Sequence, residues 1–156
     1  MLSIALSATL PGLAQVSDWQ IDSAHTAAQF SVRHMMVSNV RGQFGKTAGS
    51  ARFDPKDPAK GTVEVSVDAA SIDTREPKRD AHIKSADFFD VQKFPAITFR
   101  SKRAEAAGAG RIGAVATARI SRKEFGMTWN RAIEDGGVAV GDEVATIIDV
   151  ELVRKP

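Results

Sequence analysis

The chain has 156 residues, 43% of them hydrophobic, which fits one domain with its own core and leaves little room for a second. Lys and Arg number 21 against 19 Asp and Glu, and these charges are interspersed rather than gathered in a basic stripe, which argues against a nucleic-acid partner. Because Cys is absent, disulfides, thiolate metal sites and Cys nucleophiles are excluded.

The first residues form a short apolar run. Met1–Ala14 is rich in Leu, Ile and Ala and ends in Gly12-Leu13-Ala14, a small-x-small pattern typical of signal-peptide cleavage. No Lys or Arg precedes it, so a buried N-terminal segment is the alternative. The run is shorter than the roughly 20 apolar residues that span a bilayer. We therefore expect residues 1–14 to be a signal-peptide remnant, residues 17–156 to form the domain, and the protein to be exported without stable membrane insertion.

Alternating apolar and polar residues predict half-buried strands along most of the chain. The segment Thr62 to Asp68 is the clearest case. Glycines at 42, 45 and 49 predict bulges or a sharp bend in a strand over 41–53. The inward-facing apolar positions are expected to be Ala28, Phe30 and Val32, then Val63, Val65 and Val67, then Ile97 and Phe99, and finally Val144, Ile148, Val150 and Leu152.

Residues 77–89 break the alternation. Pro77 suits the first turn of a helix, so the segment predicts one short helix that Phe88 and Phe89 pack onto the sheet. Arg79 and Asp80 are expected to pair with neighbouring charges and fix this helix in place. Many short strands with one helix indicate a barrel or sandwich, and long strands with one apolar face favour a curved barrel.

Ordered motifs run from about Trp19 to Arg154. They are Trp19-x-Ile21-Asp22, Ser23-Ala24-His25, Phe30-Ser31-Val32-x-His34, Val40-x-Gly42-x-Phe44, Ser71-Ile72-Asp73-Thr74, Arg79-Asp80-x-His82, Asp87-Phe88-Phe89-Asp90, Phe94-Pro95-x-Ile97-x-Phe99-x-Ser101 and Ile120-Ser121-Arg122-x-Glu124-Phe125-Gly126-Met127. Together they resemble the YceI-like family of bacterial periplasmic proteins. The resemblance implies a mainly β, antiparallel, lipocalin-like barrel that holds a polyisoprenoid or quinone-like lipid, with no catalytic activity established for the family at large.

One departure from that family concerns barrel closure. After Arg103 the family usually continues through a strand pair, whereas here only the Ala/Gly linker 104–110 precedes Arg111. We therefore expect residues 96–103 to pair directly with 111–122 and the barrel to be open or groove-like. Weaker ligand binding than in full-length relatives and some tendency to dimerise through exposed strand edges should follow.

The candidate ligand-lining residues are mainly aromatic or small. Alternating alanines at 114, 116 and 118 would leave interior volume, although they would equally accommodate a large facing side chain. His34 shares the parity of Phe30, which favours a core histidine over an anchor for a ligand headgroup. The full set is Phe30, His34, Phe44, Phe88, Phe89, Phe99, Ala116, Ala118, Phe125, Met127 and Trp129.

No catalytic, cofactor or metal site is predicted. The histidines His25, His34 and His82 are dispersed, the carboxylates lie among turns or polar faces, and neither a Gly-x-Ser-x-Gly turn nor a phosphate-binding loop occurs. The favoured function is therefore non-enzymatic lipid binding. A packed structural or interaction barrel, and an unrecognised hydrolase or isomerase, are the alternatives.

Overall fold

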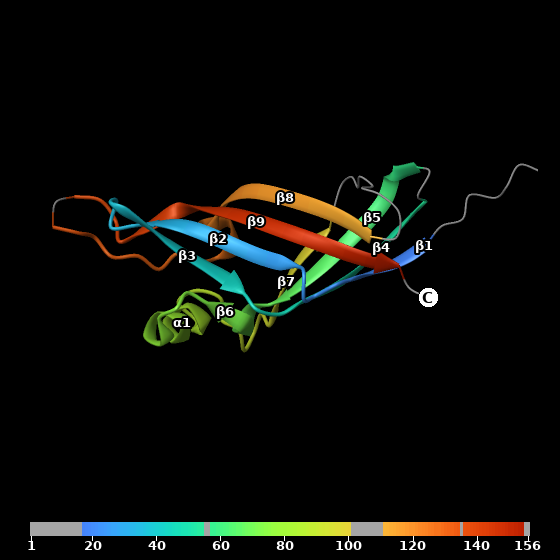
Figure 1. The fold of residues 1–156 in the computed structure, drawn as a ribbon. Coiled ribbons are helices and arrows are strands. Elements are labelled where there is room, and N and C mark those ends of the chain that lie inside the picture. Colours follow the sequence, from blue (N-terminus) through green and yellow to red (C-terminus); the bar gives the residue numbers. More distant parts are fainter. Residues whose placement is uncertain (1–16, 55–56, 101–110, 135, 155–156) are drawn as a thin grey trace, which may run out of the picture.

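The computed structural model describes residues 17–54, 57–100, 111–134 and 136–154 (Figure 1). The apolar run 1–14 and the linker 104–110 lie outside them. The elements in chain order are β1 (Ser17–Ile21), β2 (Ala27–His34), β3 (Ser38–Phe44), β4 (Thr47–Asp54), β5 (Asp57–Asp68), η1 (Ala69–Ser71), β6 (Ile72–Asp73), α1 (Pro77–Lys84), β7 (Ala96–Arg100), β8 (Arg111–Ser121), η2 (Arg122–Phe125) and β9 (Val140–Arg154). Within this part of the chain, no helix has the length and apolar character needed to cross a bilayer.

The strands of the described residues form one nine-stranded sheet, and its antiparallel pairing was expected. Its order is β6-β3-β2-β9-β1-β4-β5-β7, and β8 pairs with β9 outside this path. The long strand β9 pairs with β2 along its first part and with β1 along its last part, both on the same edge. The chain therefore bends between β1 and β2. The predicted sharp bend lies at Gly45–Lys46, where β3 ends its pairing with β2 and β4 begins its pairing with β1. Ser71 fixes this bend by accepting from both backbone N–H groups, each at 3.1 Å.

The sheet does not close into a barrel. In the described residues β7 pairs with β5, and β8 pairs with β9 over its full length, from Arg111 opposite Val153 to Ser121 opposite Glu143. The expectation that residues 96–103 pair with 111–122 is therefore wrong. β9 is long enough to pair with all of β8 along its second edge. The backbone groups of β8 on that side therefore have partners without β7. The open, groove-like form was predicted correctly.

The core lies on one face of this sheet, called here the inner face. At the end built from β1, β4, β5 and the last part of β9, this face is tightly packed, with Trp19, Ala51, Val65 and Leu152 at most 4% exposed. The alternation that predicted Val63, Val65 and Val67 as inward-facing is confirmed, since all three are buried.

The helix α1 is fastened to the sheet through Thr74, which is buried next to β6. Asp80 accepts from the Thr74 backbone N–H and hydroxyl, while Arg79 donates to the Thr74 hydroxyl and carbonyl oxygens, each at 2.8 Å. These two residues fix the helix as expected, but they do so through a threonine rather than through neighbouring charges. Figure 1 shows α1 and β6 together below β2 and β3.

Candidate functional site

The inner face changes character along the sheet. Where β8, the first part of β9 and β2 lie side by side, its apolar side chains are only partly covered. Ala118 is exposed, and the half-buried members of this uncovered inner face are Phe30 and Val32 on β2, Ala116 and Ile120 on β8, and Val144 and Ile148 on β9. Because the sheet is open, no described strand lies on the far edge of β8 to cover them.

The strand register makes this surface continuous. Ala116 pairs with Ile148, which in turn pairs with Ala28 on β2. One step along, Ala118 pairs with Thr146, which pairs with Phe30. Paired residues point to the same side of a sheet, so small, branched and aromatic side chains follow one another across three strands. The prediction that the alanines of β8 face inward holds for Ala116 and Ala118.

An inner aromatic group links this surface to the segment that follows α1. The ring of Phe44 lies 5.7 Å from that of Phe30 and 5.9 Å from that of Phe89, measured between centroids. The Phe30 ring lies directly over Gly42, where a Cβ atom would overlap it. Gly42 is therefore the residue that allows Phe30 to lie flat on the sheet.

A helix-side aromatic group stands beside it and consists of His82, Phe88 and Trp129. The His82 ring is 5.1 Å from Phe88 and 5.0 Å from Trp129, both edge to face, and the last two rings are 5.3 Å apart. His82 Nε2 lies 2.8 Å from Asp87 Oδ2. Edge-to-face packing of this kind stabilises aromatic contacts beyond their buried area. The group therefore joins α1 to the chain between η2 and β9.

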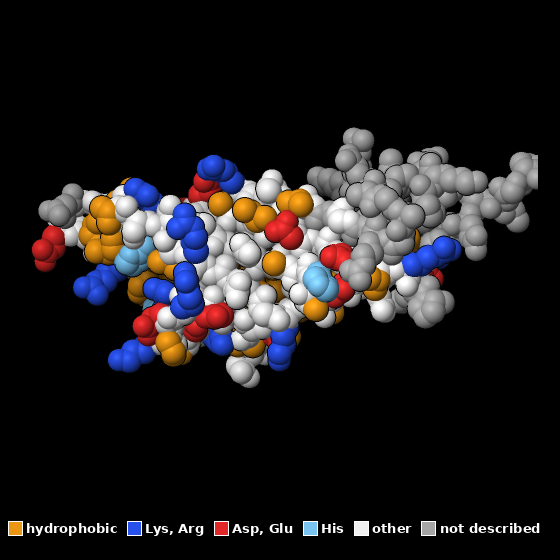
Figure 2. All heavy atoms as spheres, viewed as in Figure 1, with side chains coloured by type: hydrophobic (Ala, Val, Ile, Leu, Met, Phe, Trp, Pro, Cys, Tyr) orange, Lys and Arg blue, Asp and Glu red, His pale blue; other side chains and the backbone are white. Residues whose placement is uncertain are grey.

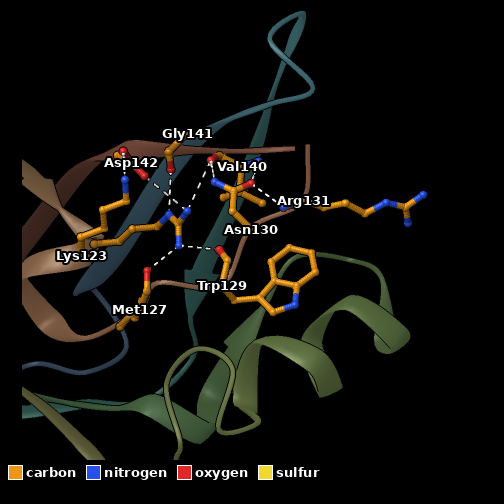
Figure 3. Close-up of polar contacts among 9 residues, drawn as sticks. Lys123, Met127, Trp129, Asn130, Arg131, Val140, Gly141 and Asp142 are labelled. Carbon is orange, nitrogen blue, oxygen red and sulfur yellow. Dashed lines mark hydrogen bonds and ion pairs between the residues drawn. The ribbon is translucent and has the colours of Figure 1, made fainter. Parts of the chain in front are cut away.

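Arg122 holds that connecting chain in place (Figure 3). Its guanidinium, 3% exposed, donates Nε to the Gly141 carbonyl at 3.0 Å and Nη1 to the carbonyls of Trp129, at 2.9 Å, and Met127. Asp142 Oδ1 lies 3.4 Å from Nη2. A planar group with five donors suits several carbonyls at once, so one side chain fixes the path that presents Trp129 to His82.

The predicted ligand-lining residues divide into three sets. Phe30, Phe44, Phe89, Ala116 and Ala118 lie on or against the uncovered inner face. Phe88 and Trp129 form the helix-side aromatic group with His82, and half-buried Met127 lies next to it in the chain. The remaining three residues lie elsewhere: Phe99 packs against the core, Phe125 is 64% exposed on η2, and His34 is exposed at the end of β2.

The interpretation of His34 as a core residue is wrong. The pairing with β9 shifts by two residues between Val32, opposite Val144, and His34, opposite Val140, and a shift of two keeps the parity with Phe30 and Val32. His34 is the last residue of β2, beside the β2–β3 turn, and it is exposed there. Alternation gives the face on which a residue lies, but not whether other side chains cover that residue.

Sequence reasoning missed two polar features. Arg122 continues the alternation of the inward-facing Ala118 and Ile120. A charged residue at a position where the alternation predicts an apolar one is a signal that could have identified Arg122 as a buried residue with polar partners. The second feature is an acid–histidine cluster, in which the ligand atoms of Asp22, His25 and Glu151 lie within 4.8 Å of one another. His25 Nδ1 is 2.9 Å from Asp22 Oδ2 across the bend between β1 and β2. Glu151 comes near because β9 pairs with both β1 and β2 on either side of the bend.

A depression of about 340 Å³ lies elsewhere, where β1 pairs with β4. Its lining includes Trp19 and Ala51, but also Asp18 and Arg52, whose side chains form an ion pair at 3.1 Å. A site lined by an ion pair favours water over an apolar chain. The uncovered inner face with its two aromatic groups is therefore the stronger candidate site.

Comparison with known proteins agrees with this architecture. Residues 19–112 match the YceI-like domain. A UPF0312 protein of Vibrio cholerae is 35% identical over 116 residues, which cover 72% of this chain and 61% of that relative's length. The fold resembles BcnA of Burkholderia cenocepacia, with a TM-score of 0.67 at 21% identity over 84% of this chain and 98% of BcnA. It also resembles a polyisoprenoid binding domain from Saccharophagus degradans, with a TM-score of 0.68 at 10% identity over 88% of this chain and 98% of that domain. The chain belongs to the YceI-like family.

Proposed function

We propose that the chain binds a long-chain apolar or amphiphilic lipid, polyisoprenoid or quinone-like, along the uncovered inner face. The observation that carries this proposal is the mainly apolar, incompletely covered surface across β8, β9 and β2, which includes the half-buried row Ile120, Val144 and Val32. Apolar surface that remains in contact with water gains free energy when a hydrocarbon covers it. The likeness in fold to a polyisoprenoid binding domain supports the same class of ligand.

The open sheet sets the scale of the affinity. Burial of about ten methylene groups contributes about 8 kcal/mol, which corresponds to binding on the micromolar scale before entropy costs. An open face covers roughly one side of the lipid's hydrocarbon chain. About half of that free energy therefore remains, and the affinity falls toward the millimolar scale. Longer isoprenoids recover part of the loss because they cover more of the face. Relatives with closed barrels should therefore bind the same ligand more tightly.

The helix-side aromatic group offers a place for a polar headgroup. His82 and Asp87 are 42% and 52% exposed and pair with each other beside Trp129. An apolar surface that ends at a small number of polar groups is the usual arrangement of a site for an amphiphile. The ligand would thus lie with its chain on the inner face and its polar end toward α1.

Binding without catalysis is the function that these residues favour. The guanidinium of Arg122 is engaged with backbone carbonyls, and the hydrogen bonds of His25 and His82 go to Asp22 and Asp87. These contacts give Arg122 and His25 structural roles, and they leave His82 and Asp87 as the polar end of the proposed lipid site. A protein of this kind stores or carries its ligand.

Export to the periplasm is part of the proposal. It is supported by the apolar run that ends in Gly12-Leu13-Ala14, a small-x-small pattern typical of signal-peptide cleavage. The intact mass of protein recovered from the periplasm tests it. A mature species that begins after Ala14 is expected, and one that still begins at Met1 would contradict it.

Self-association is also proposed, through the strand edges that the open sheet leaves. Within the described residues β8 has its one partner in β9, and β7 has its one partner in β5. Strand edges of this kind pair readily with another chain. Light scattering after size exclusion should show a dimer that grows with concentration, and a monomer at every concentration would refute this part.

A titration with a short polyisoprenol tests the central proposal. The chain has two Trp and no Tyr, so its emission reports on Trp129 at the site and on Trp19 in the core. Wild type should show a saturable change that is lost in Trp129→Phe. Ala118→Asp, on the inner face, should weaken binding about tenfold or more.

Thr117→Asp is the matched control, because Thr117 is also exposed but lies on the opposite face of β8. It should bind as wild type does. Equal losses in the two variants, or no saturable change in wild type, would contradict the proposal.

A further inference from the structure

The turn between β2 and β3 exposes an apolar tip, called here the methionine tip and formed by Met35, Met36 and Val37. These side chains are 39%, 51% and 78% exposed. Val138, on the loop that packs beside them, is 36% exposed. Figure 2 shows hydrophobic side chains gathered at this end of the molecule. A cluster of exposed apolar residues on a protein surface marks an interaction site more often than isolated ones do.

The backbone of the tip is strained. Met35 and Met36 have φ angles of 50° and 60°, and the Val37 N–H donates to the His34 carbonyl at 3.2 Å. Two positive φ angles inside such a turn are the pattern of a type I′ hairpin, which strongly prefers Asn-Gly. Methionine carries a Cβ that this conformation disfavours, and the exposed side chains return little packing. Strain held without a structural benefit points to a function.

Other contacts hold this strained turn rigid. Arg33 donates Nε and Nη2 to the Met36 carbonyl at 3.1 and 2.8 Å. The Met35 N–H donates to the Ala139 carbonyl at 2.9 Å, which ties the tip to the neighbouring loop. The tip is therefore presented in one conformation rather than left free to turn inward.

Basic side chains surround the tip. The hairpin from Arg33 to Arg41 contains no Asp or Glu, and both of these arginines are exposed. Arg131, exposed on the neighbouring loop, extends away from the chain in Figure 3. The same loop also carries Glu134, which is exposed, and Asp135 follows it in the sequence. The hairpin itself is thus the basic and apolar part of this end.

We propose that the methionine tip docks reversibly on the surface of a bilayer that contains anionic lipid. This inference rests on the proposed function, because contact with a bilayer is the step by which a lipid would reach the inner face. Apolar side chains enter the headgroup region while flanking arginines meet the phosphates. A protein partner fits less well, since a stable protein interface needs about 800 Å² from each side and the tip offers three side chains.

Vesicle sedimentation tests this proposal with four variants and the wild type. Wild type should bind phosphatidylcholine vesicles that contain phosphatidylglycerol, and bind pure phosphatidylcholine more weakly. Val37→Ser should lower the bound fraction several-fold. Its matched control is Val115→Ser, because Val115 is also exposed, at 69%, but lies on β8.

The double variant Met35→Asn/Met36→Gly separates docking from folding. Asn-Gly suits the turn, so the variant should melt at the same temperature as wild type or higher, yet lose vesicle binding. Glu134→Gln should strengthen binding to anionic vesicles. Retained vesicle binding by the double variant, or an equal loss in Val115→Ser, would overturn the proposal. So would a wild type that shows no preference for anionic vesicles or a tip that proves to mediate dimerisation instead.

The polyisoprenol titration distinguishes this proposal from the proposed function. The tip variants should bind soluble polyisoprenol as wild type does, because the inner face is unchanged. A wild type that docks on vesicles through the tip but binds no polyisoprenol would refute lipid carriage and leave the docking surface standing.

Discussion

Replacement of Arg122 by methionine should destabilise the protein far more than any change to the charged residues around it. Methionine keeps the apolar stem and removes the guanidinium, which is 3% exposed. The carbonyls of Met127, Trp129 and Gly141 then lose their donor. The chain between η2 and β9 would no longer be held, and Trp129 would separate from His82.

The magnitude follows from these contacts. A hydrogen bond to a charged group contributes about 1.5–3 kcal/mol, and breaking a buried charged network by removing one partner costs about 3–5 kcal/mol. Some of the freed carbonyls will find water, so we expect a loss of about 3 kcal/mol in the free energy of unfolding. For a chain of this size that lowers Tm by roughly 6–12 °C.

Urea denaturation measures the loss, and hydrogen exchange locates it. Backbone amides between Met127 and Gly141 should exchange faster, while those of β5 keep their protection. Lys123→Met is the control, because Lys123 is 53% exposed in its ion pair with Asp142 and should cost less than about 1 kcal/mol. Equal losses for the two variants, or protection unchanged in this segment, would refute the reasoning.

Three further predictions concern the sheet and the acid–histidine cluster. Phe30→Asp should cost about 2–3 kcal/mol or abolish lipid binding, since it puts a carboxylate on the uncovered inner face; unchanged melting and unchanged binding would mean that the two faces are inverted. Gly49→Ala should cost roughly 2 kcal/mol or more by urea denaturation, because its Cβ would overlap the Glu64 carbonyl oxygen, which cannot move without shifting β5; a loss of a few tenths would contradict this. Dialysed protein should carry no stoichiometric metal by elemental analysis; about one zinc per chain, lost on mutation of the acid–histidine cluster, would overturn that expectation.

Much of the strand content could be predicted from the sequence because alternation is a local property. Val63, Val65 and Val67 point inward whichever strand pairs with theirs, and their burial confirms it. The short helix was predictable for the same reason, because Pro77 marks its first turn and the Glu76 side chain caps it by accepting from the Lys78 N–H. Contacts such as that of Phe89 with Phe44 then follow from where the helix lies.

Features that depend on distant pairing were not predictable in this way. The partner of β8 is β9 rather than β7, and alternation along β8 is the same for either choice. His34 keeps the parity of Phe30 but lies at the last position of β2, where it is exposed, and parity does not tell how far the covered part of a strand extends. The carbonyls that Arg122 binds come from both sides of a loop, so no local pattern announces them. The composition of the candidate site was thus easier to infer than the strand pairing that builds it.

Native mass spectrometry of protein purified without detergent tests the central claim most directly. The wild-type chain should carry a non-covalent adduct with the mass of a polyisoprenoid or quinone, or acquire one on exposure to such a lipid. The adduct should persist in Thr117→Asp and be lost in Ala118→Asp, which differ in the face of β8 that they change. A wild type that remains free of lipid after that exposure, while folded by its melting curve, would contradict the claim that the uncovered inner face is a lipid site.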